Sequence, residues 1–148
     1  MGSVWLDAFA GTGAVGLEAL SRGADLVIWN DQSRDAHRVL EANLKRCGVE
    51  SGFRLYHKNV FALLEDLEQE VSFVFLDPPY RFSRHQKLLE RLKHSRVFSS
   101  QTIILLEISK RTGLDILPPG LEVFHILRAG DSHLLWIRTD SRGAASEG

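Results

Sequence analysis

The sequence predicts an α/β fold: a doubly wound, mostly parallel sheet of seven strands that ends in an antiparallel hairpin. Three observations predict it. Short apolar runs alternate with helical patterns along most of the chain, as in parallel strands joined by crossover helices. A glycine-rich turn follows the first apolar run, where such sheets hold ligands. The last two apolar runs are separated by the turn Ala129-Gly130-Asp131-Ser132, which is short enough for a hairpin.

The first half of the chain gives three strands, each followed by a helix. Apolar runs predict strands over residues 4–8, 25–30 and 53–57, and apolar residues grouped along one stripe predict helices over 14–22, 34–47 and 60–67. Ser33 and Asn59 are the expected N-caps of the second and third helices. Gly48 is expected just past the end of the second helix. Cys47, near that end, is expected to be a small packing residue.

The second half continues the alternation and then departs from it. Residues 71–76 and 102–108 read as strands around a helix at 84–93, and residues 121–127 and 133–138 read as the closing hairpin. Residues 1–139 are expected to form one domain, because the length of 148 residues fits a single domain. The composition of residues 140–148 predicts a flexible tail.

Bulk properties fit the expectation of a protein in a reducing cytoplasm. No apolar run approaches membrane-spanning length, and the N-terminus carries no secretory signal pattern. The single cysteine cannot form an internal disulfide. The net charge of −1 is a poor match for a protein that binds nucleic acid with its whole surface.

The tetrapeptide Asp77-Pro78-Pro79-Tyr80 directly follows the fourth expected strand. An ionised Asp77 offers only acceptors, and Pro78 lacks an N–H but keeps its carbonyl. Two adjacent acceptors suit an NH₂ group, and Tyr80 adds a ring on which a base can stack. We therefore interpret Asp77, Pro78 and Tyr80 as a catalytic clamp for the exocyclic amine of a nucleobase. The alternative is that the two prolines merely end a strand.

A basic stretch begins directly after this tetrapeptide. Residues 81–96 contain six lysines and arginines against one glutamate. We interpret Pro79, Arg81, Arg84 and Lys87 as substrate-binding residues, the cations contacting phosphates. The alternative is an ordinary solvated helix face.

The glycine-rich turn predicts a cofactor site. Gly11, Gly13 and Gly16 satisfy the dinucleotide pattern, and Asp31 follows Gly11 by twenty residues, where a ribose-binding acid is expected. An NAD(P) oxidoreductase thus remains open. Asp7 at the end of the first strand favours S-adenosylmethionine (SAM), because a carboxylate there can meet an ammonium group and would repel a pyrophosphate.

One further position and the histidines complete the reading of the site. Asn59 can offer its amide to an adenine edge, and the alternative is a simple helix cap. The six histidines are scattered and no Cys/His spacing suits zinc, so no metal is expected.

The segment from Asp7 to Ala24 (DAFAGTGAVGLEALSRGA), with Asp31 and the tetrapeptide from Asp77, resembles the RsmD-type methyltransferases. The resemblance runs from about Val4 to Arg138, including Leu105-Leu106-Glu107-Ile108-Ser109. It implies a Rossmann-like methyltransferase fold and transfer of methyl from SAM to the N2 amine of a guanine in small-subunit ribosomal RNA. The partner would be that RNA or the small ribosomal subunit.

Carried over to this sequence, the resemblance assigns the site residues. The methionine part of SAM would be held by the segment Asp7, Ala8, Phe9, Ala10, Gly11, Thr12 and Gly13. Asp31 would bind the ribose hydroxyls, and Asn59 with Val60 would meet the adenine. The target base would be held by residues 77–80.

The chain departs from the family pattern in places. The family usually has an acidic residue at the position of Asn59 and often Asp at that of Ser33. Its members carry a basic β-hairpin and a helix before the first strand, and this chain begins almost at that strand, so we expect the RNA-docking segment to be missing. Open alternatives are a non-catalytic SAM-binding fragment and an adenine-N6 methyltransferase acting on nucleic acid.

Overall fold

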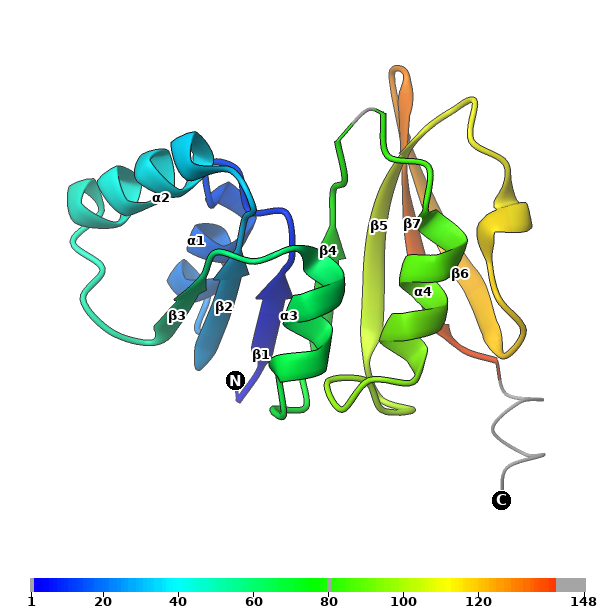
Figure 1. Cartoon of the computed structure of the whole chain (residues 1–148), viewed down its shortest axis with the longest axis horizontal. Helices are drawn as coiled ribbons and strands as arrows, with labels where there is room; N and C mark the ends of the chain where they lie inside the picture. Colours follow the sequence, from blue (N-terminus) through cyan, green and yellow to red (C-terminus); the bar gives the residue numbers. More distant parts are fainter. Residues whose placement is uncertain (1, 80, 141–148) are drawn as a thin grey trace.

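A single mixed sheet organises the chain in the computed structural model, which describes residues 2–79 and 81–140. Within these residues seven strands follow the order β3-β2-β1-β4-β5-β7-β6 (Figure 1). Their bounds are β1 (Val4–Asp7), β2 (Leu26–Asn30), β3 (Phe53–Tyr56), β4 (Phe73–Leu76), β5 (Ile103–Ser109), β6 (Leu121–Ala129) and β7 (Ser132–Thr139). The first five strands pair in parallel, and β7 runs antiparallel to both β5 and β6. The predicted fold class is confirmed.

Four α-helices and a short 3₁₀ helix connect the described strands: α1 (Ala14–Ser21), α2 (Arg34–Arg46), α3 (Val60–Asp66), α4 (His85–Lys93) and η1 (Leu114–Ile116). The expected caps are confirmed. Ser33 Oγ accepts a hydrogen bond from the Ala36 N–H at 3.2 Å, and Asn59 Oδ1 accepts one from the Phe61 N–H at 2.9 Å. Gly48 has a φ of 70° just past α2, the left-handed conformation that glycine provides at a helix end.

Two sequence expectations need correction. The closing turn contains only Gly130 and Asp131, because the φ of 58° at Gly130 allows a two-residue hairpin turn, and both strands therefore extend further than predicted. Cys47 does not pack in the core but is exposed. It is the C-cap residue beyond α2, whose buried residues are Leu40 and Leu44.

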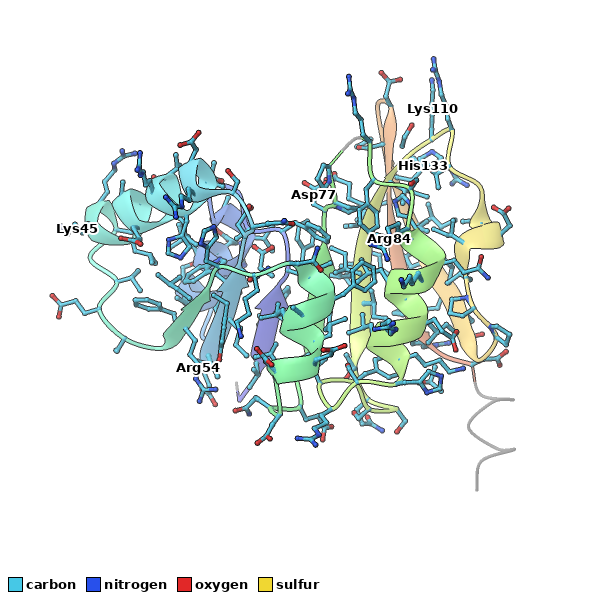
Figure 2. The ribbon with its side chains drawn as sticks, viewed as in Figure 1. Lys45, Arg54, Asp77, Arg84, Lys110 and His133 are labelled. Carbon is cyan, nitrogen blue, oxygen red and sulfur yellow. The ribbon has the colours of Figure 1, made fainter. Side chains whose placement is uncertain are left out.

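The strand order reverses direction between β1 and β4. The chain winds outward from β1 through β2 to β3, then returns to place β4 on the other side of β1. At such a switch point the connecting loops diverge and leave a crevice at the carboxyl ends of the strands. Figure 2 shows Asp77 at this edge of the sheet, close to the start of α4, where Arg84 lies.

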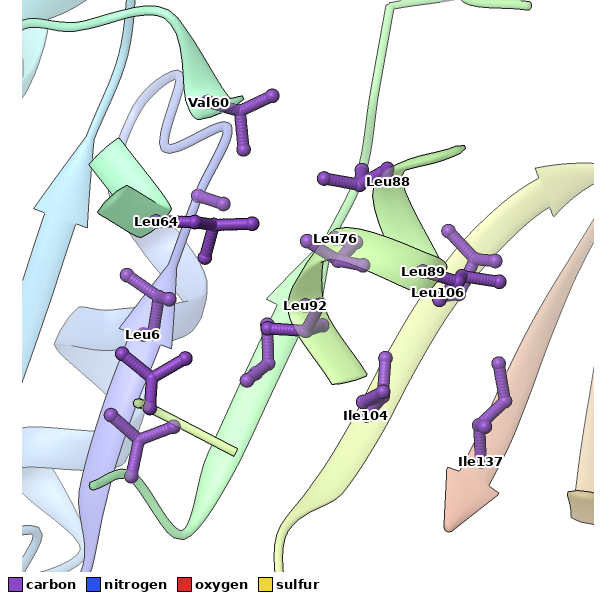
Figure 3. Close-up of a cluster of buried hydrophobic side chains, with 14 of the residues drawn as sticks. Leu6, Val60, Leu64, Leu76, Leu88, Leu89, Leu92, Ile104, Leu106 and Ile137 are labelled. Carbon is purple, nitrogen blue, oxygen red and sulfur yellow. The ribbon is translucent and has the colours of Figure 1, made fainter. Parts of the chain in front are cut away.

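The two faces of the sheet are packed by different helices. On one face, α3 and α4 bury leucines against apolar residues of β1, β4 and β5, including Leu6, Leu76 and Ile104 (Figure 3). On the other face, the core of α1 and α2 centres on Trp29, which is fully buried with Val27, Leu40 and Leu44. The second core fixes the start of α1, and with it the glycine-rich turn.

Gly16 allows α1 to approach this second core closely. A Cβ at Gly16 would lie 2.4 Å from Trp29 Nε1 and 2.6 Å from Val27 Cγ1. We predict that Gly16→Ala lowers the free energy of unfolding by about 1–3 kcal/mol, because overpacking exceeds the gain in helix propensity. Urea denaturation measures the change, with Ser21→Ala on the same helix as the control. An unchanged midpoint for Gly16→Ala would contradict the close packing.

Candidate active site

A cleft of about 680 Å³ opens at the carboxyl ends of β1 to β4. Its walls come from four loops that are distant in the sequence. Nine residues selected from the sequence line it: Ala8, Phe9, Gly11, Asp31, Asn59, Val60, Asp77, Pro79 and Arg84. The tertiary structure therefore brings the expected cofactor residues and the first residue of the clamp to one place.

The glycine-rich turn is held by its neighbours on both sides. The Ala10 N–H donates to the Asn30 carbonyl at 2.9 Å, and Asn43 of α2 donates its amide to the Thr12 carbonyl at 2.8 Å. Gly11 and Gly13 have φ values of 54° and 81°, which side chains rarely tolerate. Around Gly11 a Cβ would meet nothing within 4 Å. Gly11 thus presents bare backbone to the cleft.

Asp31 is oriented by two backbone groups. Its Oδ2 accepts from the Gly11 N–H at 2.9 Å, and its Oδ1 accepts from the Ser33 N–H at 2.8 Å. A carboxylate has about four lone-pair sites, so both oxygens retain acceptor capacity toward the cleft. This geometry suits the pair of hydroxyls on a ribose, the role expected for Asp31.

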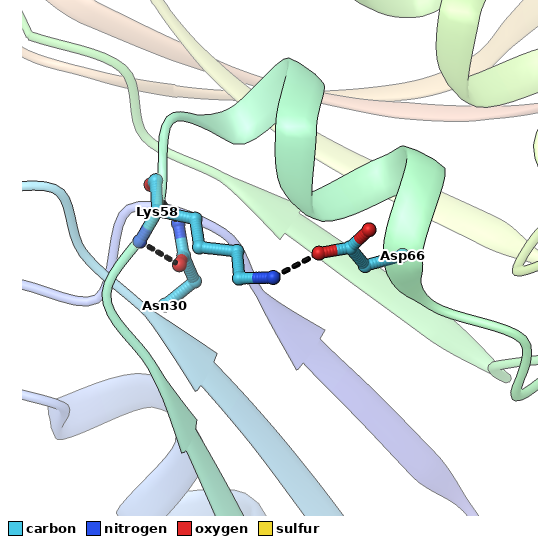
Figure 4. A network of polar contacts seen from close by, with 3 residues as sticks. All are labelled: Asn30, Lys58 and Asp66. Carbon is cyan, nitrogen blue, oxygen red and sulfur yellow. Dashed lines mark hydrogen bonds and ion pairs between the residues drawn. The ribbon is translucent and has the colours of Figure 1, made fainter.

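Asn30 joins the ends of three strands beneath the cleft. Its amide donates to the carbonyls of Ala8 and Lys58, and its oxygen accepts from the Lys58 N–H at 3.0 Å. The Lys58 side chain pairs in turn with Asp66 on α3 (Figure 4). Asn30 is buried and its polar atoms are satisfied, so it fixes the relative positions of the loops that carry the lining residues.

Asp7 lies beneath the cleft as a buried acid. It is 3% exposed, and its Oδ1 has no hydrogen-bond partner among the described residues. Burial, followed by the negative charges of Asp77 and Asp31, raises the pKa of Asp7 to about 7. A buried carboxylate is costly unless a positive charge compensates it. This arrangement fits a cationic ligand.

Asp77 is paired with Glu107, a residue that was not expected at the site from the sequence. Partial burial, a hydrogen bond to Glu107 and the charge of Glu107 raise the pKa of Asp77 to about 6, although the side chain remains open to solvent. The register of β4 and β5 explains the pairing: Leu76 lies opposite Leu106, so the next residues are Asp77 and Glu107. Glu107 could have been noticed in the sequence, because it is a charged residue within the otherwise apolar run of residues 103–108.

Aromatic side chains form the wall near α3 and α4. The rings of Phe9 and Phe82 meet edge to face with centroids 5.8 Å apart, and the Arg84 guanidinium lies 4.4 Å from the centre of the Phe61 ring. Phe61 and Phe82 also line the cleft, and neither residue was expected there from the sequence. His85 contacts Phe82, and burial lowers its pKa.

Other selected residues lie outside the lining of the cleft. Ala10 and Gly13 are buried within the glycine-rich turn, and Thr12, whose carbonyl holds Asn43, is exposed. Lys87 borders a neighbouring hollow with Arg84. Arg81 is exposed, Pro78 is half-buried, and Tyr80 lies outside the described residues.

The basic stretch divides into two parts. Arg84 and Lys87 face the Phe61 ring beside the cleft. Arg91 and Arg96 instead pair with Glu65 and Glu68, at 3.7 Å and 2.7 Å. The ordinary interpretation, a solvated face with ion pairs, therefore describes the second part.

Neither a metal centre nor a membrane span is found among residues 2–79 and 81–140. No group of three or more His, Cys, Asp or Glu side chains there could hold a metal ion. No helix in the same residues is long and apolar enough to cross a bilayer.

The residues of the cleft distinguish between the two cofactor classes. SAM carries a sulfonium and an ammonium group, which Asp7 and its acidic neighbours can compensate, whereas the pyrophosphate of a dinucleotide would be repelled. With the order β3-β2-β1-β4-β5-β7-β6, the fold and site define the class of SAM-dependent methyltransferases, whose cofactor is SAM.

The chain belongs to the family described as Conserved hypothetical protein 95, the RsmD-type family, whose model matches residues 1–138. It is 30% identical over 113 residues to Ribosomal RNA small subunit methyltransferase D of Escherichia coli, covering 76% of this chain and 57% of that protein. The chain spans about three fifths of the length of the curated relatives it matches. The resemblance stated from the sequence is confirmed.

Solved structures share the fold. A conserved hypothetical protein from Streptococcus pyogenes superposes with a TM-score of 0.86 at 26% identity, over 94% of this chain and 87% of that chain. A ribosomal protein L11 methylase from Lactobacillus delbrueckii subsp. bulgaricus superposes with a TM-score of 0.76 at 15% identity, over 95% and 71% of the two chains. The second likeness concerns the fold alone.

Proposed function

We propose that this chain transfers a methyl group from SAM to the exocyclic N2 amine of a guanine in small-subunit ribosomal RNA. One observation carries the proposal: Asp77, followed by Pro78, lies at the end of β4 beside the end of β1, where Asp7 lies. An amine acceptor that lines the cleft thus lies close to a compensating acid beneath it. The Escherichia coli relative is named as a ribosomal RNA small subunit methyltransferase, which supports the choice of RNA.

The chemistry is mainly positioning. The target base leaves its stack at a cost of a few kcal/mol, and Tyr80 is proposed to recover about 1–3 kcal/mol by stacking. Asp77 and the Pro78 carbonyl accept the two amine hydrogens. These bonds take the nitrogen lone pair out of conjugation and aim it at the methyl carbon. Because the sulfonium becomes a neutral thioether, the leaving group needs no protonation, and positioning supplies most of the acceleration.

Charge and nucleic-acid contacts complete the proposal. The product amine is cationic until it loses a proton, and an ionised Asp77 stabilises that charge. Arg84 and Lys87, beside the cleft, are proposed to contact phosphates together with Arg81. The partner is ribosomal RNA or the small subunit, which places the protein in the cytoplasm.

Calorimetry with SAM and with NAD tests the cofactor. We expect binding of SAM and none of NAD, because the acids around Asp7 repel a pyrophosphate. As a control, Glu50→Gln should bind SAM as the wild type does. Glu50 precedes β3 and therefore lies at the opposite edge of the sheet from the cleft. Binding of NAD without binding of SAM would overturn the assignment in favour of an oxidoreductase.

Transfer of labelled methyl to naked ribosomal RNA and to small ribosomal subunits tests the reaction. We expect label in one of the two substrates, with the modified base mapped to a guanine and the methyl to its N2. Label on adenine N6 would instead support the other amino-group chemistry. SAM binding without transfer to any nucleic acid would support a non-catalytic SAM-binding fragment.

A further inference from the structure

Glu107 lies next to the clamp but outside the cofactor cleft. Asp7 on β1 lies opposite Phe75 on β4, and Leu76 on β4 lies opposite Leu106 on β5. Side chains alternate along a strand, so Asp77, two residues after Phe75, follows the same face as Asp7. Glu107, the residue after Leu106, lies opposite Asp77 and on that face as well. The cleft is lined by the loops after β1, β2, β3 and β4, and no residue of β5 contributes to its lining. Asp77 therefore lies between the cofactor cleft and Glu107. The methyl-accepting base would lie on the Glu107 side of Asp77.

The three adjacent acceptors match guanine and no other amino-bearing base. The Watson–Crick edge of guanine offers three hydrogens, one on N1 and two on N2. Adenine and cytosine offer only two amine hydrogens, and the neighbouring ring nitrogen is an acceptor. Enzymes that act on an extruded base read this edge by hydrogen bonds. Asp77 and the Pro78 carbonyl account for the two amine hydrogens, and Glu107 is the third acceptor.

We propose that Glu107 accepts the N1–H of the target base and so selects guanine; this inference rests on the proposed function. The ring nitrogen of adenine or cytosine would instead direct a lone pair at the Glu107 carboxylate. Leaving that carboxylate without a donor costs part of the binding energy in the transition state. The choice of guanine thus depends on whether the ring nitrogen beside the amine carries a hydrogen. Asp77 and Pro78 alone do not contact that nitrogen in this scheme.

The pairing of Asp77 with Glu107 is consistent with this role. Glu107 lies close enough to Asp77 to raise its pKa, so the two carboxylates repel each other when both are ionised, and a base that donates hydrogens to both relieves this repulsion. Among the charged groups nearby, Asp7 on β1 interacts with both Asp77 and Asp31, and Arg84 before α4 lines the same cleft as Asp77 but lies over the Phe61 ring. Removing the Glu107 charge lowers the pKa of Asp77, since that charge helps to raise it.

The test compares guanine with 2-aminopurine at the mapped target position of an RNA fragment. 2-Aminopurine keeps the amine on C2 but has an unprotonated N1 and lacks the C6 carbonyl. The contact that we assign to Glu107 is therefore isolated by the change in the guanine to 2-aminopurine ratio between the wild type and Glu107→Gln. We expect the wild type to favour guanine by about 10²-fold or more in kcat/KM. In Glu107→Gln this ratio should fall to within about tenfold, because the Gln amide can donate to N1. In Glu107→Gln the fall of methyl transfer at acid pH should also move to lower pH, because the pKa of Asp77 is lower without the Glu107 charge.

Two variants serve as controls for structure. Glu107→Asp keeps the carboxylate and should lose rate while retaining the preference for guanine, and Glu50→Gln should leave both unchanged. SAM affinity and thermal unfolding report whether each variant is folded. An unchanged guanine to 2-aminopurine ratio in folded Glu107→Gln, with an active wild type, overturns the role of Glu107 alone. A wild type that binds SAM but modifies no guanine overturns the proposed function as well.

Discussion

Asp77→Ala is expected to reduce methyl transfer by about 10³-fold or more, since it removes a group that stabilises the charge developing on the amine. SAM affinity should stay within a few-fold, because the other residues that line the cleft remain. Single-turnover transfer and calorimetry measure the two quantities separately. Near-normal turnover in this variant would contradict the clamp.

The pH dependence of the wild type gives a second check on Asp77. Its pKa is raised to about 6 by partial burial and by Glu107, so the carboxylate is ionised above this pH and neutral below it. A neutral Asp77 accepts hydrogen bonds poorly, and transfer should fall as the pH falls through about 6. Asp77→Asn should keep one acceptor oxygen, remain weakly active and lose this acid limb. An acid limb that persists in Asp77→Asn would assign it to another group.

Asp7→Asn is expected to stabilise the ligand-free protein while weakening SAM binding by at least about tenfold, as expected for loss of a buried charge contact. The pKa of Asp7 is raised from 3.8 to about 7. The folded state therefore binds a proton that the unfolded state has released between these values. The stabilisation from this proton is complete below pH 4 and is lost as the pH rises toward 7. At pH 8 the wild type carries the full penalty of a buried carboxylate.

The size of this effect follows from the shift. At 1.36 kcal/mol per unit of pKa, about three units correspond to an upper bound of about 4 kcal/mol, and the cost of burying the amide reduces the gain to about 1–3 kcal/mol. Urea denaturation at pH 5 and pH 8 measures it. The gap between Asp7→Asn and the wild type should widen at the higher pH, whereas Glu50→Gln should show no such change. A destabilised Asp7→Asn with unaltered SAM affinity would contradict the inference that Asp7 compensates the positive charge of a cationic ligand.

Local patterns were sufficient for most of the fold. Alternating apolar runs and helical stripes depend on residues that are close together in the sequence. The seven strands, the caps Ser33 and Asn59 and the final hairpin could therefore be predicted. Exact ends were less predictable, because they depend on groups elsewhere. The hairpin turn is tighter than expected since Gly130 adopts a positive φ, and Cys47 is exposed since α2 ends before it.

The residues that could carry the chemistry are recognisable in the sequence. Asp7 ends a strand, whereas the glycine-rich turn, Asp31 and the segment from Asp77 each follow one, and parallel strands end at one edge of a sheet. How these residues act depends on the folded arrangement. Strand register placed Glu107 beside Asp77, and burial left Asp7 Oδ1 without a partner. Register and desolvation depend on residues far apart in the chain, which is why neither could be read from the local pattern.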